Sequence, residues 1–192
     1  GCEPNEINKR LGLVETCEVL SWTLDPDAMT GRDQYGHTIA LHPFMGVMGL
    51  PPDEPGIHPT NPPRFCGGNI DCKELVAGST LYLPITLPEA LFSVGDGHAV
   101  QGDGEVSGVA LECPMECVDL TFYLRDDLPL TTPRIHSSKG WMTLGFHENL
   151  HEASYIAVDA MLDLMVEQYQ ISRPQAIALA SLVVDVRVTQ IA

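Results

Sequence analysis

Residues 95–105, with the sequence GDGHAVQGDGE, constrain the fold of this chain more than any other segment. Four glycines alternate there with acidic, imidazole and amide side chains, although glycine weakens both helices and strands. In an extended backbone successive side chains point to opposite faces, so Asp96 and His98 share one face. A second set shares a face further along: Gln101, Asp103 and Glu105. Because glycine is used where a backbone turns sharply or another group approaches closely, the segment predicts a metal centre or an acid–base centre.

Three other readings of this segment differ in how far the sequence supports them. Gly-Asp and Asp-Gly are common turn dipeptides, so two turns joined by Ala-Val would give a similar string without a function. A calcium loop starting at Asp103 follows the EF-hand pattern as far as Gly108, but its twelfth position is Pro114 instead of glutamate. A phosphate-binding loop is excluded because no Gly-Lys-Ser/Thr follows. The two-turn alternative stays open.

Composition narrows the class of protein. The chain has 192 residues, enough for one domain or for part of a larger one. Its 26 acidic residues exceed its 10 Lys and Arg, which gives a formal charge of −16 that would repel a phosphate backbone. No apolar run is long enough to span a bilayer. We therefore expect neither nucleic acid nor membrane among the partners.

The cysteines predict a reducing compartment. They lie at positions 2, 17, 66, 72, 113 and 117, without a Cys-x-x-Cys pair and without a preceding signal-peptide pattern. Six are too few for a disulfide scaffold in a chain of this length, so we expect free thiols and a cytoplasmic protein. Cys66 and Cys72 flank residues 67–71, so a cysteine nucleophile is an alternative to the metal or acid–base centre, although no neighbouring residue activates either thiol.

The hydrophobic pattern changes from strands to helices along the chain. Alternation of apolar and polar residues predicts strands at 15–24, 81–85, 106–111, 118–124 and 184–188, and apolar runs at 42–48 and 91–94 are further candidates. A proline-rich loop at 50–63 is a candidate pocket wall. Residues 150–169 have helical period after Asn149, and a capping box at Ser172 begins a second helix. The sequence predicts an α+β, β-rich fold with sandwich-like antiparallel or mixed sheets and two helices near the C-terminus.

A second metal pattern lies at the start of the first helix. His147, Glu148 and His151 match the His-Glu-x-x-His signature of zinc peptidases. That chemistry needs both imidazoles within one helix, whereas the cap at Asn149 starts the helix after His147. We therefore expect a solvated helix terminus, with a metallopeptidase as a minor alternative.

Several segments together resemble the bacterial acetamidase/formamidase family. They are HPFMGVMG at 42–49, GGNID at 67–71, GSTLYLPI at 78–85, the string at 95–105, NLHEA at 149–153 and DVRVTQ at 185–190. The resemblance implies a β-rich fold with C-terminal helices and a cytoplasmic homo-oligomer that releases ammonia from formamide or acetamide. Members of the family are longer at both ends, so we expect residues 1–192 to form a single amidase-type domain of a longer chain.

The residues themselves suggest how such hydrolysis would work. Asp96 and His98, with Asp71, would hold a divalent metal that activates water and polarises the amide carbonyl. Mixed oxygen and nitrogen ligands suit zinc, and also manganese or iron. The remaining roles fall to four residues: Glu105 as general base, Asn69 and Gln101 as amide-binding groups, and Asp103 as the residue that orients His98. The alternative from another class is a β-sandwich module that binds calcium and a sugar without turnover.

Overall fold

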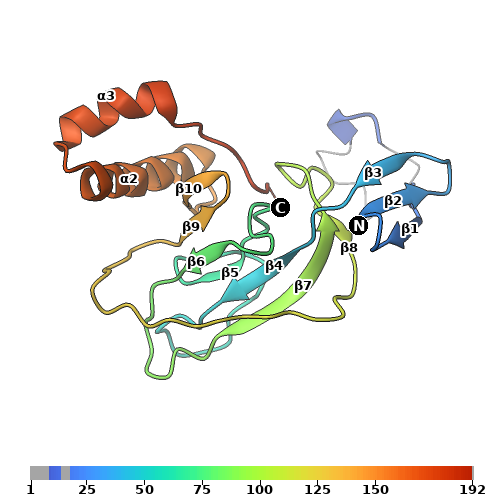
Figure 1. Ribbon diagram of the computed structural model, residues 1–192, viewed down its shortest axis with the longest axis horizontal. Helices are drawn as coiled ribbons and strands as arrows, with labels where there is room; N and C mark the ends of the chain where they lie inside the picture. The colour runs from blue at the N-terminus through green and yellow to red at the C-terminus, as the bar shows by residue number, and fades with distance from the viewer. Residues whose placement is uncertain (1–8, 14–17, 192) are drawn as a thin grey trace. The chain divides into compact units, whose positions relative to one another are not determined.

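The computed structural model describes residues 9–13 and 18–191, which fall into two compact units, Gly1–His42 and Pro43–Ala192 (Figure 1). The described part of the first unit contains an antiparallel sheet in the order β1-β2-β3. Its strands are β1 (Trp22–Asp25), β2 (Thr30–Asp33) and β3 (Thr38–Ala40). The strand expected at 15–24 lies partly outside the described residues, and its described end coincides with the start of β1. The single domain expected over residues 1–192 stays a prediction.

The second unit contains two antiparallel sheets that share one core. The first has the order β5-β4-β7-β8, with β4 (Phe44–Gly49), β5 (Gly67–Asn69), β7 (Ser93–Val100) and β8 (Leu111–Glu112). The second has the order β10-β9-β6, with β6 (Thr80–Tyr82), β9 (Arg134–Ser137) and β10 (Gly140–Thr143). Buried side chains from both sheets and their loops form this core: Met48, Ile70, Cys72, Leu75, Ile135 and Leu144. The sandwich-like, β-rich prediction is therefore confirmed.

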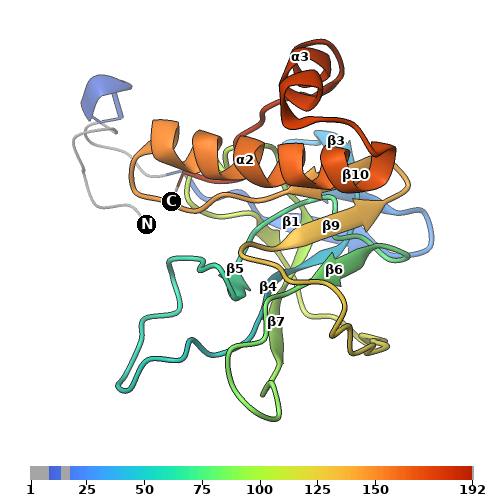
Figure 2. The ribbon, with the colours of Figure 1, turned by 90° about the vertical axis from the view of Figure 1, so that its left-hand side faces the viewer.

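Two helices complete the second unit, as the sequence predicts. α2 spans Leu150–Tyr169, and the Asn149 side chain accepts hydrogen bonds from the backbone N–H groups of its first turn. α3 spans Arg173–Val183 and begins with a complete capping box at Ser172. Figure 2 shows α2 lying along β9 and β10, and the Thr143 hydroxyl donates to the Ala157 carbonyl at 2.7 Å. Among the described residues, none of the helices combines the length and the apolarity that crossing a bilayer requires.

Three of the expected strands differ from the structure. Residues 118–124 form no strand, and the alternating apolar side chains there are exposed. Residues 106–108 form a turn in which the Gly108 N–H donates to the Glu105 carbonyl at 2.7 Å, so the strand expected at 106–111 is reduced to the short β8. Residues 184–188 are irregular, and a parallel bridge between Gly104 and Gln190 lies just beyond them. Alternating apolar and polar residues indicate that one face of a segment could be buried. A strand also needs the edge of a neighbouring strand to pair with.

Candidate functional site

The glycine-rich segment lies within a central strand and in the loop that follows it. β7 continues to Val100, so Asp96 and His98 lie inside the strand and not beyond its end. β4 pairs with β7 in antiparallel register, with Phe44 opposite His98 and Met45 opposite Gly97. Asp71 follows β5 on the other side of β4. Sequence segments that are far apart therefore converge on one region of this sheet.

Five side chains, which we call the His98 cluster, gather there: Asp71, Asp96, His98, Glu105 and Glu112. Asp71, His98 and Glu105 are all buried, and each offers one ligand atom within 4.8 Å of the others. Asp96 and Glu112, which are more exposed, form a second such group with His98. The structure thus brings together every predicted metal ligand and the predicted base, and adds Glu112. These groups can hold a metal ion.

Gln101 orients the His98 imidazole. Its side-chain NH2 donates to the backbone carbonyl of Asp71 at 2.8 Å, and its Oε1 lies 3.1 Å from His98 Nδ1. An Oε1 acceptor calls for a proton on Nδ1, which leaves the Nε2 lone pair free on the other side of the ring. The Phe44 ring packs edge-on against the same imidazole, with ring centroids 4.9 Å apart. His98 Nε2 is therefore available as a ligand atom.

Two atoms of the cluster lack a hydrogen-bond partner. They are His98 Nε2 and Asp71 Oδ1, both fully buried and 4.0 Å apart. Asp96 Oδ2 lies 3.2 Å from the same nitrogen without forming a hydrogen bond. Buried polar atoms in proteins are nearly always paired, so unpaired atoms that face one another point to a missing group. A divalent cation, which accepts both carboxylate oxygen and neutral imidazole, fits this donor set.

Gly46 leaves room for such an ion. A Cβ at this position would lie 2.7 Å from Asp71 Oδ1, 2.8 Å from Asp96 Oδ2 and 2.8 Å from His98 Cε1. Its carbonyl also accepts the N–H groups of Ile70 and Asp71 at 3.0 and 3.1 Å, which places Asp71 beside the strand. The three side chains therefore surround a position that glycine alone keeps open.

The backbone at the acidic residues is unusual. Asp71, Asp96 and Glu105 all have left-handed conformations, with φ of 47°, 60° and 40°. Non-glycine residues rarely adopt this region, and each instance costs on the order of 1 kcal/mol or more. Strain of this kind is concentrated at functional sites, where it fixes side-chain direction. Three such residues in one cluster support a site that is built for a ligand.

Burial and like charges alter the titration of two carboxyl groups. Burial, together with the charge of Glu105, raises the pKa of Asp71 to about 7. Burial also raises the pKa of Glu105, with the negative charge of Asp96 acting in the same direction. In the absence of a cation the cluster therefore resists carrying its full negative charge near neutral pH.

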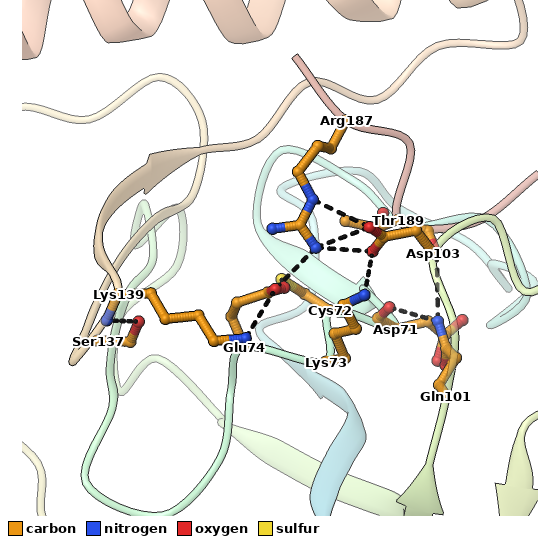
Figure 3. Close-up of polar contacts among 10 residues, drawn as sticks. All are labelled: Asp71, Cys72, Lys73, Glu74, Gln101, Asp103, Ser137, Lys139, Arg187 and Thr189. Atoms are coloured by element: carbon orange, nitrogen blue, oxygen red, sulfur yellow. Dashed lines mark hydrogen bonds and ion pairs between the residues drawn. The ribbon is translucent and has the colours of Figure 1, made fainter. Parts of the chain in front are cut away.

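Gln101, and not Asp103, contacts the His98 imidazole, so the predicted direct contact of Asp103 with His98 is wrong. Asp103 instead belongs to a second group, the Glu74 network, which consists of Lys73, Glu74, Asp103, Lys139 and Arg187 (Figure 3). Arg187 donates to Asp103 through both Nε and Nη2, at 3.0 and 2.8 Å. Although burial acts to raise the pKa of Asp103, the hydrogen bonds and charges of Lys73 and Arg187 outweigh it and hold that pKa below its usual range.

Asn69 lies at the end of β5, where its backbone carbonyl accepts a hydrogen bond from Gln190 Nε2 at 2.6 Å. Its predicted role in binding the substrate amide stays a prediction.

Sequence reasoning missed Gly46, Glu112 and Arg187. Gly46 could have been found as a glycine in the interior of a largely apolar strand, whereas the other two are joined to the site only by tertiary contacts.

The other sequence motifs do not form comparable sites in the described part of the chain. α2 begins at Leu150, so His147 lies outside the helix, and neither His147 nor His151 belongs to a group that could hold a metal. Burial raises the pKa of the Cys66 thiol, and it raises that of Cys72 to about 12. Both thiols are therefore protonated at neutral pH, which opposes a cysteine nucleophile.

Known proteins resemble parts of this chain. The model of the Acetamidase/Formamidase family matches residues 56–191. A formamidase from Methylophilus methylotrophus is 48% identical over 48 residues, which are 25% of this chain and 12% of that protein. An acetamidase from Mycolicibacterium smegmatis is 46% identical over 48 residues, again 25% of this chain and 12% of that protein.

Solved structures extend the likeness to most of the fold. The crystal structure of an acetamidase from Yersinia enterocolitica has a TM-score of 0.77 and 27% identity, and the match covers 88% of this chain and 50% of that one. An acetamidase from Bacillus halodurans has a TM-score of 0.70 and 25% identity, with 89% of this chain and 57% of that one covered. The chain thus spans about half the length of these structures. With a family match over most of its length, the chain belongs to the acetamidase/formamidase family.

Proposed function

We propose that this chain carries the catalytic metal centre of an amidase that hydrolyses short-chain aliphatic amides, formamide and acetamide, to the carboxylate and ammonia. The names of its relatives, formamidase and acetamidase, supply the substrate class. The observation that carries the proposal is the pair of unpartnered buried atoms, Asp71 Oδ1 and His98 Nε2, that face the space beside Gly46. Amide hydrolysis requires a strong nucleophile and a stabilised oxyanion, and this site suits both requirements.

Asp71, Asp96 and His98 are the proposed metal ligands. Three protein ligands are the number that a catalytic zinc site uses, which leaves one position for water or substrate, and we propose zinc as the ion. When bound, a divalent ion would lower the pKa of water and polarise the amide carbonyl. Asp71 must be ionised to serve as a ligand, and its raised pKa means that binding displaces a proton below about pH 7.

Glu105 is the proposed general base. It is buried, lies within the same 4.8 Å group as Asp71 and His98, and has a pKa above its ordinary value. A carboxylate with this property takes a proton from water and gives it to the departing nitrogen near neutral pH. The leaving group then departs as ammonia. Gln101 has both amide atoms engaged with Asp71, Thr189 and His98, so we now propose it as a residue that positions His98 and not as a substrate ligand.

Two further predictions concern the whole protein. We propose a cytoplasmic location, which the free thiols of the four described cysteines support, and a homo-oligomeric state, which rests on the family resemblance. The only partner proposed at the site is the small amide substrate. These predictions do not affect the chemistry of the His98 cluster.

Ammonia release from formamide and acetamide tests the proposal. The purified chain is assayed after chelation and again after zinc or manganese is restored, beside Glu105→Gln. We expect activity that requires the metal and falls by about 100-fold to 10,000-fold in this variant, with zinc affinity retained because a base is not a ligand. Glu148→Gln, an exposed acid outside the cluster, serves as the matched control and keeps full activity.

Each alternative outcome has a distinct meaning. Ammonia release that survives chelation would contradict the metal mechanism. Tight metal binding without ammonia release would contradict an amidase and favour a module that binds calcium and a sugar. Loss of zinc affinity in Glu105→Gln would reassign Glu105 from base to ligand.

A further inference from the structure

The segment that follows α3 lies against the loop that carries Gln101 and Glu105. The Gly104 N–H donates to the Thr189 carbonyl at 3.0 Å, and the Ile191 N–H donates to the Gly104 carbonyl at 3.1 Å. The side-chain NH2 of Gln101 also donates to the Thr189 carbonyl, at 3.2 Å. Residues separated by more than eighty positions in the sequence are therefore joined beside the His98 cluster.

Arg187 fixes this segment in place. Figure 3 shows its guanidinium between Glu74 and Asp103, and Nη2 lies 2.8 Å from a carboxylate oxygen of each. The Glu74 side chain is only 2% exposed, whereas that of Arg187 is 42% exposed, so the acidic side of this ion pair is buried. The contact with Asp103 involves two guanidinium nitrogens, and such paired charge-assisted bonds fix direction as well as distance. Lys73 adds a further contact to Asp103 at 3.0 Å.

The contacts continue from Arg187 to the imidazole. Asp103 lies between Gln101 and Glu105 in one short loop, so holding its carboxylate restrains both neighbours. Gln101 is restrained at Thr189 as well, and its Oε1 faces His98 Nδ1. Side chains beyond the ligands of a metal site often set ligand orientation and change metal affinity by about 10-fold to 100-fold.

We propose that Arg187 is a positioning residue for the His98 cluster. Its ion pair with Asp103 holds the 101–105 loop and the segment at 187–191 together, which keeps Gln101 on Nδ1 and so keeps Nε2 available as a ligand. The ligand role of Nε2 rests on the proposed function, whereas the orientation of the ring does not.

The first readout is the protonation of the His98 ring in the metal-free protein, measured by 15N NMR above the pH at which the ring is charged. In the wild type we expect a single form with the proton on Nδ1. In Arg187→Gln and in Asp103→Asn we expect a mixture of the two tautomers. Arg173→Gln is the matched control, because Arg173 is similarly exposed and pairs with Asp159 and Asp163 on the helices.

The second readout is zinc affinity in the same proteins. We expect about 10-fold weaker binding in Arg187→Gln and in Asp103→Asn, no change in Arg173→Gln, and partial recovery in Arg187→Lys. The double variant Arg187→Gln/Asp103→Asn should bind zinc as tightly as Arg187→Gln does, because both changes remove the same contact. If Arg187→Gln fails to fold because Glu74 loses its nearer cationic partner, Asp103→Asn still decides the question.

The outcomes separate this inference from the proposed function. An unchanged tautomer and unchanged zinc affinity in folded Asp103→Asn would overturn the positioning role. A wild type that binds no zinc would contradict the proposed metal centre, and the tautomer comparison would then decide the role of Arg187 by itself.

Discussion

The His98 cluster and the Glu74 network lie next to each other and both contain carboxylates, four in the first and two in the second, but they differ in what faces those carboxylates. In the Glu74 network, Glu74 and Asp103 meet Lys73, Lys139 and Arg187. In the His98 cluster, the acidic groups face one another and the His98 imidazole. Two buried atoms there, Asp71 Oδ1 and His98 Nε2, have no hydrogen-bond partner. Carboxylates that pair with cations are typical of contacts that stabilise the fold. Carboxylates without such partners are typical of a site that binds a ligand.

The contrast is sharpest between Asp103 and Glu105, which are two residues apart on one loop. The cations around Asp103 lower its pKa against the effect of burial, whereas burial and the charge of Asp96 raise the pKa of Glu105. A residue's neighbours in space therefore decide which of the two acids has a lowered pKa and which has a raised one.

The largest effect that we expect comes from filling the space in the His98 cluster. In Gly46→Ala the new methyl group would meet the ends of Asp71, Asp96 and His98 at less than 3.0 Å. These side-chain ends can move aside, so the protein should fold, but the ligand atoms would no longer converge. We predict that zinc affinity falls by at least about 100-fold, measured by competition with a chromophoric chelator.

Gly95→Ala is the matched control for this substitution. Gly95 lies on β7 opposite Val47, and a Cβ added there meets no atom within 4 Å. Zinc affinity in this variant should equal that of the wild type. Equal losses in both variants would show that the strand, and not the space beside Gly46, controls binding.

The next-largest effect that we expect is on the stability of the metal-free protein, which should depend on pH through Asp71. The pKa of Asp71 is raised from 3.8 to about 7, so its protonated form stabilises the folded state below about pH 4 and this stability is lost as the pH rises to about 7. Asp71→Asn removes the charge. We predict that at pH 8 the metal-free variant is more stable than the wild type by on the order of 2 kcal/mol, and that the difference disappears near pH 4.

Urea denaturation across this pH range measures the difference. Zinc affinity of the wild type should rise with pH up to about 7, because binding requires ionised Asp71. A variant that is less stable than the wild type at pH 8 would mean that Asp71 is compensated after all, and the contrast between the two clusters would fail.

The smallest effect that we expect is a loss of stability, in contrast to the gain expected for Asp71→Asn. Asp103 has a lowered pKa, so it stabilises the folded state above its ordinary pKa of 3.8, and this contribution is lost as the pH falls below that value. We predict that Asp103→Asn costs about 1 kcal/mol of unfolding free energy at pH 7, a modest figure because the ion pair is partly exposed. Urea denaturation at pH 7 and pH 3 measures it, and a gain in stability at pH 7 would contradict the assignment.

Local signals in the sequence predicted much of the fold. The side-chain caps at Asn149 and Ser172 identified where α2 and α3 begin, because a cap acts within one helical turn. The alternation at 118–124 failed, since no property of that segment specifies a neighbouring strand to pair with. Phe122 is 66% exposed even though its ring contacts Phe92.

The candidate site was predictable to a similar extent. Asp96, His98 and Glu105 come from one glycine-rich segment, and Asp71 from another, so chemical composition was enough to select them. The role of Asp103 was not predictable, because its partner Arg187 is 84 residues away. A carboxylate two residues from a base looks the same in sequence whether it faces a cation or an empty space.

The most direct test of the central claim is to locate a metal ion. Crystals of the purified chain with zinc, measured at the zinc absorption edge, should show one anomalous peak about 2.0–2.2 Å from both Asp71 Oδ1 and His98 Nε2. The Glu74 network should show none, because its acids already have cationic partners. A peak at Glu74, or none at the His98 cluster in crystals with excess zinc, would contradict the account.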